Sequence, residues 1–101
     1  MNPVSTQKTI EKAYQLLGDP WVLGIITHLE LGSLRFCGLQ RALHNLNPVT
    51  LTNRLKKLEA AGLIRRQVET IDKISVAYVL TEKGRRTIPV IRALESYAQG
   101  I

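Results

Sequence analysis

The spacing of apolar residues changes along the chain, and this change restricts the folds that the chain can adopt. In residues 8–62 apolar side chains recur every three or four positions, as on one face of an α-helix. In residues 64–80 they alternate with other side chains, and the two alternating runs predict a β-hairpin. After Thr81 a helix is predicted again, running toward Gln99. We therefore expect a mainly helical α+β fold, with one domain over residues 1–101, because 101 residues are too few for two ordinary domains.

Capping residues divide the part before the hairpin into four predicted helices. Three of these helices end at a glycine: Gly18, Gly32 and Gly62. Two pairs, Asp19-Pro20 and Asn47-Pro48, place an N-cap before a proline at the first helical position, where its missing N–H costs nothing. The third helix is brief and is joined to the fourth by a tight turn. This arrangement is typical of a helix-turn-helix.

The second predicted helix is apolar on nearly every side, from Trp21 to Leu31. A helix with this pattern is expected to be buried by its neighbours. We therefore expect it to be the central element of the fold, with Trp21 in the core. A short extended link over residues 33–36 should follow it.

Positive charge is concentrated in one third of the chain. The sequence holds 14 Lys and Arg against 8 Asp and Glu, a formal net charge of +6. Residues 35–66 contain seven of the cations and a single anion, Glu59, so the whole excess lies there. Lysines that merely keep a protein soluble should be spread more evenly. The concentration favours an anionic partner such as nucleic acid.

Other classes of protein find no support in the sequence. No apolar run approaches the roughly 18 residues of a membrane span, and residues 1–6 lack the apolar stretch of a signal peptide. A cytoplasmic protein without membrane contact is expected. One cysteine and two distant histidines make no metal-ligand cluster, and no cofactor is expected. Neither His28 nor His44 has a carboxylate or serine at a motif spacing, which argues against an enzyme.

The predicted helix after Asn47 has two contrasting faces. Its apolar stripe consists of Leu51, Leu55 and Leu58. The opposite face combines amide, hydroxyl, methyl and ammonium groups without an acid, a mixture that can read base edges in the major groove of DNA. The residues predicted to contact DNA are Arg35, Pro48, Val49, Thr50, Thr52, Asn53, Lys56, Lys57 and, at the hairpin tip, Lys73. The alternative role of the hairpin is only to cover the core.

The last predicted helix carries more apolar surface than one packing contact needs. Ile88, Ile91 and Leu94 belong to an apolar arc that also includes Val90 and Tyr97. Such surplus surface indicates a partner. Pro89 is expected to kink this helix, because proline cannot donate the backbone hydrogen bond.

Four groups of residues, spread over almost the whole chain, carry a resemblance to a known family. They are Gly18-Asp19-Pro20-Trp21 with Ile25, Ile26 and Leu29; Arg35-Phe36 with Leu39; Asn47-Pro48-Val49-Thr50-Leu51 through Arg54-Leu55, Leu58-Glu59 and Gly62-Leu63-Ile64; and Val76, Tyr78 and Leu80-Thr81-Glu82-Lys83-Gly84-Arg85. Together they resemble the HxlR-type winged helix-turn-helix transcriptional regulators of prokaryotes, relatives of the MarR-like group. The resemblance implies sequence-specific binding of a double-stranded DNA operator by a homodimer.

The resemblance also implies that the first and last helices form the dimer interface. The interface residues expected on this basis are Ile10, Tyr14, Leu17, Ile88, Ile91, Leu94 and Tyr97. The inducing signal, a small molecule or a redox change, is left open. Many family members have a Cys-Pro pair before the first helix that is sometimes used for thiol sensing, whereas this chain has Asn2-Pro3. The hairpin also lacks the prolines common in the family.

Two questions stay open at this point: the role of Cys37, and whether the partner is DNA or another protein. Cys37 falls at the expected start of the short third helix, where the helix dipole favours a thiolate, so it is a candidate redox sensor. The simpler interpretation is a small buried residue or a helix cap. For the whole protein, the alternative to a DNA-binding regulator is a winged-helix adaptor that binds other proteins without operator specificity.

Overall fold

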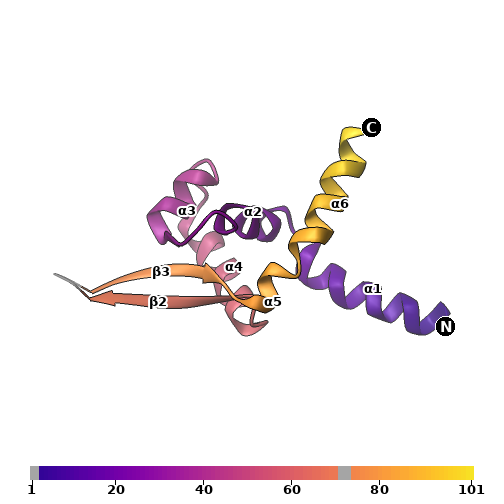
Figure 1. The fold of residues 1–101 in the computed structure, drawn as a ribbon, viewed down its shortest axis with the longest axis horizontal. Coiled ribbons are helices and arrows are strands. Elements are labelled where there is room, and N and C mark those ends of the chain that lie inside the picture. Colours follow the sequence, from indigo (N-terminus) through magenta and orange to yellow (C-terminus); the bar gives the residue numbers. More distant parts are fainter. Residues whose placement is uncertain (1–2, 71–73) are drawn as a thin grey trace.

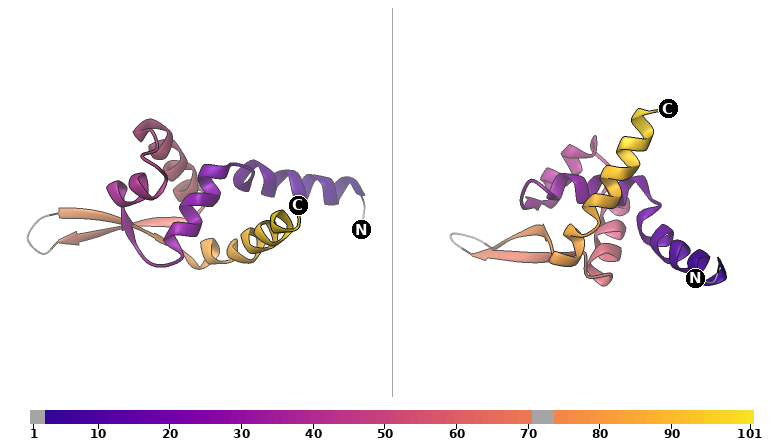
Figure 2. Two further views of the ribbon diagram at one scale, coloured as in Figure 1. Left: turned by 90° about the horizontal axis from the view of Figure 1, so that it is seen from above. Right: turned by 45° about the vertical axis from the view of Figure 1, so that its right-hand side comes forward.

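A helical body carries a β-hairpin on one side and two diverging helices on the other (Figure 1). The computed structural model describes residues 3–70 and 74–101. In chain order the elements are α1 (Pro3–Leu17), α2 (Pro20–Leu29), β1 (Leu34–Arg35), α3 (Phe36–Ala42), α4 (Pro48–Ala60), β2 (Ile64–Thr70), β3 (Ile74–Leu80), α5 (Glu82–Arg85) and α6 (Ile88–Gln99). The molecule measures 55 × 28 × 23 Å along its principal axes because the hairpin and α1 point in opposite directions (Figures 1 and 2).

The predicted caps of α2 and α4 are confirmed. Asp19 Oδ1 accepts a hydrogen bond from the Trp21 N–H at 2.8 Å, and Asn47 Oδ1 accepts one from the Val49 N–H at the same distance. At the other end of α4, the Leu63 N–H donates to Leu58 O and the Gly62 N–H donates to Glu59 O. This termination needs a left-handed residue, and Gly62 supplies it with a φ of 77°.

The core forms between α2, α3, α4 and the base of the hairpin. Its completely or almost completely buried side chains are Val22, Ile25, Ile26, Leu29, Leu39, Leu51, Leu55, Leu58, Leu63 and Ile64. As expected, α2 is the central element. However, the prediction that Trp21 lies in the core is wrong, because its side chain is 38% exposed. Four buried residues occupy the inner face of α2, and Trp21, one position from Val22, is turned away from that face.

The end of α2 also differs from the prediction. The helix stops at Leu29, not at Gly32, and Glu30 is its C-cap. Leu31 therefore lies outside the helix, and its side chain is 92% exposed. Gly32 has a φ of 144°, a conformation that favours glycine, and it redirects the chain toward β1.

The predicted hairpin is confirmed and belongs to a sheet with the strand order β1-β3-β2. Ile64 pairs with Leu80, and Val68 pairs with Val76. Ile64 and Leu80 are buried, whereas Val68 is 60% exposed, so the outer part of the hairpin stands away from the core. The segment expected only as an extended link contributes β1, which pairs with β3. Lys73 at the hairpin tip lies outside the described residues.

The predicted single helix from Thr81 to Gln99 is wrong, because the chain forms two helices. α5 ends at Arg85, and α6 begins at Ile88 with Pro89 in its first turn. Pro89 cannot donate to the Arg85 carbonyl, and its ring would crowd that carbonyl in a continuous helix. The proline therefore interrupts the helix instead of merely kinking it, and α6 leaves in a new direction (Figure 1).

α5 is held tightly against the corner between α4 and β2. Thr81 Oγ1 donates to Gly62 O at 2.6 Å, and the Thr81 N–H donates to Leu63 O at 3.0 Å. Gly84 is buried in this contact. A Cβ atom at position 84 would lie 2.1 Å from Leu63 O, which is far inside van der Waals contact.

We predict that Gly84→Ala lowers the free energy of unfolding by about 2–3 kcal/mol, because the new methyl group forces two backbone segments apart. The measurement is urea denaturation followed by circular dichroism. Gly100→Ala is the matched control, since its added Cβ meets only Tyr97 O at 3.5 Å. Equal denaturation midpoints for the two variants would contradict the close approach at Gly84.

Candidate DNA interface

α4 exposes a polar face on the side opposite its leucines. Leu51, Leu55 and Leu58 are buried, so the helix is fixed in rotation about its own axis. The geometry of 3.6 residues per turn then directs Asn53 and Lys56 outward, and both are exposed. Pro48, Val49 and Ala60 are exposed too, while Thr50 and Thr52 are half-buried. The single acid of α4, Glu59, is bound to Arg66 through an Nε–Oε1 contact of 3.2 Å.

The turn before α4 is held by hydrogen bonds to α3. The Asn45 N–H donates to Gln40 O at 2.8 Å, and Gln40 Nε2 donates to Leu46 O at 3.0 Å. His44 and Asn45 both have a φ of 58°, which brings the chain sharply back toward Asn47. These bonds hold α3, the turn and α4 together as one rigid unit, which leaves the polar face of α4 exposed to solvent.

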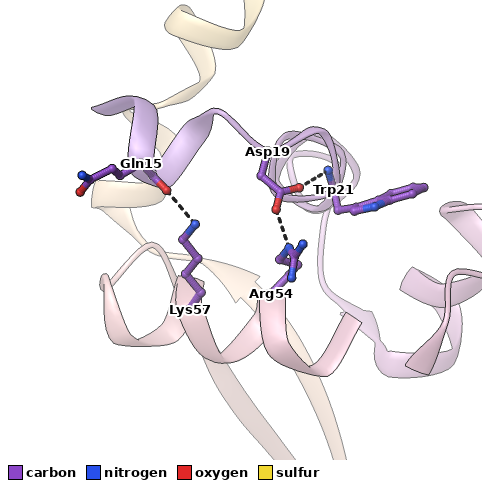
Figure 3. A network of polar contacts seen from close by, with 5 residues as sticks. All are labelled: Gln15, Asp19, Trp21, Arg54 and Lys57. Carbon is purple, nitrogen blue, oxygen red and sulfur yellow. Dashed lines mark hydrogen bonds and ion pairs between the residues drawn. The ribbon is translucent and has the colours of Figure 1, made fainter. Parts of the chain in front are cut away.

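Several cations of the basic segment are used inside the fold. Arg54 Nε donates to Asp19 Oδ2, and Lys57 Nζ donates to the main-chain oxygen of Gln15 at 2.7 Å (Figure 3). In contrast, Lys56 and Arg65 are exposed, and within the described part of the chain their side chains make no hydrogen bond or ion pair. The exposed positive charge beside α4 is thus smaller than the count along the sequence suggested.

Asp19 serves two partners at once. One carboxylate oxygen caps α2, and the other accepts from Arg54 (Figure 3). Partial burial raises the pKa of Asp19, but the hydrogen bonds from the Trp21 N–H and Arg54, together with the Arg54 charge, outweigh this effect. The net pKa therefore lies below the ordinary value of 3.8. Sequence reasoning found the cap but missed Arg54, because 35 positions separate the two residues.

The remaining predicted contact residues lie around this face. Arg35 is exposed and directly precedes α3. Cys37 is exposed near the start of α3, so the interpretation of it as a buried residue is wrong. Arg41 on α3 is a further exposed cation that sequence reasoning did not select. Among residues 3–70 and 74–101, no three His, Cys, Asp or Glu side chains are grouped as a metal site.

The residues expected at a dimer interface fall into two groups. Ile10, Tyr14, Leu94 and Tyr97 are exposed, whereas Leu17, Ile88 and Ile91 are half-buried against the core of the same chain. α1, α2 and α6 together form an apolar groove of about 500 Å³. The groove is lined by Ile10, Ala13, Tyr14, Leu17, Gly18, Pro20, Leu23, Val90 and Leu94.

These elements define a winged helix-turn-helix protein, in which α3, the turn and α4 are the helix-turn-helix and β2–β3 is the wing. The HxlR-like helix-turn-helix family model matches residues 16–101, and the chain belongs to this family. It is therefore a transcriptional regulator of the helix-turn-helix type and not an enzyme. Within the described residues, no helix combines the length and the apolar character that a membrane span requires.

Relatives and solved structures agree with this assignment. The uncharacterized regulator YvaP of Bacillus subtilis is 35% identical over 98 residues, which cover 97% of this chain and 91% of YvaP. The reduced form of YodB from B. subtilis superposes with a TM-score of 0.82 at 33% identity, covering 97% of this chain and 91% of YodB. The redox regulator HypR in its reduced form gives a TM-score of 0.83 at 27% identity and covers 91% of both chains.

We predict that the contribution of Asp19 to stability disappears in acid. Because folding lowers its pKa, this contribution is complete above the pKa of the unfolded chain, near 4, and is lost as the pH falls through the lower folded value. Asp19→Asn keeps a capping oxygen but removes the charge, so it should cost up to about 1 kcal/mol at pH 7 and less at pH 2. Urea denaturation at both pH values measures this difference. A cost that is equal at both would show that the Asp19 charge contributes nothing.

Proposed function

We propose that this regulator binds double-stranded DNA sequence-specifically through the exposed face of α4 and acts as a homodimer. The observation that carries the proposal is the chemistry of that face, where Val49, Asn53 and Lys56 are exposed and the one acid of α4, Glu59, is paired with Arg66. An α-helix fits the major groove, where an Asn amide pairs with adenine N6 and N7 and a Val methyl contacts the thymine methyl. Lys56 can reach a phosphate at the edge of the groove.

Residues around α4 would hold the helix in register on the phosphate backbone. Pro48, Thr50 and Thr52 lie on α4, and Arg35 is the N-cap of α3. On the wing, Arg65 and the sequence-predicted Lys73 would contact the backbone beside the groove. Contacts of this kind position the protein without reading bases. Lys57 is not among the proposed contacts, because its ammonium group is bonded to Gln15 O.

The second copy would cover the apolar surface of α1 and α6. Tyr14 is 70% exposed and Tyr97 is 77% exposed, and between their helices lies the apolar groove. A two-fold dimer through this surface would bring two α4 helices to successive major grooves about 34 Å apart. A second copy of this chain is the favoured occupant over a foreign partner, because the family resemblance implies a homodimer through the same surface of α1 and α6.

If the inducing signal is a redox change, the sequence limits which residue could sense it. HypR, to which the chain is similar, is described as a redox regulator. Redox control through a thiol in this chain would have to use Cys37, because the sequence contains no other cysteine. Cys37 is exposed and is the second residue of α3, so its oxidation would alter the helix that supports α4.

DNA binding can be tested by selection from a random duplex library, followed by titration of the selected and unrelated DNA at two salt concentrations. If the dimer neutralises six or more phosphates, affinity should fall by about 10³ or more between 50 and 200 mM salt. Asn53→Ala should relax base preference by about 1–3 kcal/mol at one position. Lys56→Ala should weaken binding to all sequences and lower the salt slope by about 1 per chain.

Lys12→Ala is the matched control for Lys56→Ala, since it removes the same charge from the polar side of α1. It should leave both the affinity and the salt slope almost unchanged. If the wild-type chain selects no motif and binds all DNA weakly, the adaptor alternative is favoured. Equal losses on selected and unrelated DNA for Asn53→Ala would exclude base reading by that residue.

We predict that Leu94→Asp produces monomers, because it places a charge in the apolar groove, where a second copy would bury it. Leu31→Asp is the matched control: Leu31 is an equally large and even more exposed side chain that does not line the groove. Analytical ultracentrifugation measures the mass in solution. A wild-type monomer, or an unchanged dimer in Leu94→Asp, would contradict the proposed interface.

A further inference from the structure

The junction between α1 and α2 lies directly against one side of α4 (Figure 3). Two side chains from α4 reach it. Lys57 Nζ donates to Gln15 O, in the last turn of α1, at 2.7 Å. Arg54 Nε donates to Asp19, the N-cap of α2. We refer to these two bonds as the junction contacts.

The junction contacts match the electrostatics of both helix ends. The last carbonyl groups of a helix have no partner within it, and a cation near them is favoured by the helix dipole. Lys57 meets this need at the end of α1. Asp19 uses Oδ1 to cap α2, and its second carboxylate oxygen, Oδ2, accepts the hydrogen bond from Arg54 Nε.

Arg54 and Lys57 are three positions apart, so they lie on the same side of α4. That side is an edge between the buried leucine stripe and the face that carries Asn53 and Lys56. Figure 3 shows both side chains extending from α4 toward the junction. Their charged ends are therefore directed at the protein and not along the face that would enter a groove of DNA.

The direction of α1 is set at its C-terminal end. Leu16 and Leu17 pack against the core, whereas residues 7–15 of α1 are exposed. The rest of the helix extends away from the body on the side opposite the hairpin (Figures 1 and 2). At 1.5 Å per residue, a rotation of about 10° at Leu17 would move Ile10 by about 2 Å, or about 4 Å summed over two copies. This is about the rise of one base pair, roughly 3.4 Å.

We propose that Arg54 and Lys57 are positioning residues for DNA recognition, which fix the half-site spacing that the dimer accepts. They hold the α1–α2 junction against α4 and so set the orientation of the dimer-forming surface of α1 relative to the recognition face. The proposal rests on the proposed function, because it needs two copies joined through α1 and α6 and two α4 helices on DNA.

The first experiment needs no DNA. In a Cys37→Ser background, spin labels are attached at Lys8→Cys on α1 and Lys56→Cys on α4, and the labelled chain is diluted into unlabelled chain. Pulsed electron resonance then measures the distance between the labels within one chain. Lys57→Met should broaden the distance distribution without lowering the melting temperature by more than a few degrees, because Lys57 is exposed.

Two further variants make this measurement specific. Lys57→Arg should restore the narrow distribution, since a guanidinium group can also donate to Gln15 O. Gln15→Ala should have no effect, because the acceptor is the main-chain oxygen. An unchanged distribution in Lys57→Met would overturn the positioning role, whatever the DNA measurements show.

The second experiment uses the selected motif with its two half-sites moved closer or farther apart by one base pair. Lys57→Met should reduce the discrimination between spacings by about fivefold, the effect of one partly exposed hydrogen bond to a charged group. Base preference within each half-site should stay the same. Lys56→Met is the matched control and should weaken binding at all spacings alike.

The salt slope distinguishes positioning from direct contact. If Lys57→Met lowers the salt slope and leaves the spacing preference unchanged, Lys57 is a phosphate contact and the proposal is wrong. If the wild-type chain binds no duplex, the proposed function is wrong, and so is the role of Arg54 and Lys57 in half-site spacing. The label distances then still report whether the junction contacts orient α1.

Discussion

The packing of α4 across α2 is the interaction on which the rest of the structure depends. Leu51, Leu55 and Leu58 are fully or almost fully buried in the core that α4 shares with the inner face of α2, and this burial fixes the rotation of α4. Each buried leucine contributes roughly 1.5–3 kcal/mol, so no single polar contact at the surface competes with this face. The outward direction of Asn53 and Lys56 is a geometric consequence of the leucine contact. The turn after α3 and the corner at Gly62 then only have to bring the chain to and from this helix.

Much of the fold was predictable because its signals are local. Asp19 and Asn47 cap the helices that they were expected to cap, and the alternation in residues 64–80 forms the expected hairpin. The errors have a shared physical origin in contacts between elements. Trp21 is apolar, but α2 has only one face against the core. β1 is two residues long, too short for any periodicity, and is defined by its pairing with β3. Pro89 was expected to kink one continuous helix, and it instead separates α5 from α6.

The sequence predicted which side of α4 is exposed, but it did not predict which cations near that side are paired within the chain. Helical spacing alone separates Asn53 and Lys56 from the leucines, and the structure agrees with that separation. The charge count treated all cations of residues 35–66 alike, whereas Arg54, Arg66 and Lys57 have partners within the chain. Lys57 is 42 positions from its partner Gln15, so no local pattern could reveal the bond. The tertiary fold decides which charges remain for an external partner.

The bond from Lys57 to Gln15 joins a side chain to the main chain, and this has a consequence for how such regulators evolve. A backbone carbonyl is present whatever amino acid occupies position 15, so mutation there does not remove the acceptor. Selection on the bond therefore acts only at position 57, where a long cationic side chain is required. Substitutions at the two positions would not be correlated among descendants of this chain. Methods that infer contacts from coupled substitutions would overlook this bond, although it ties the first helix to the fourth.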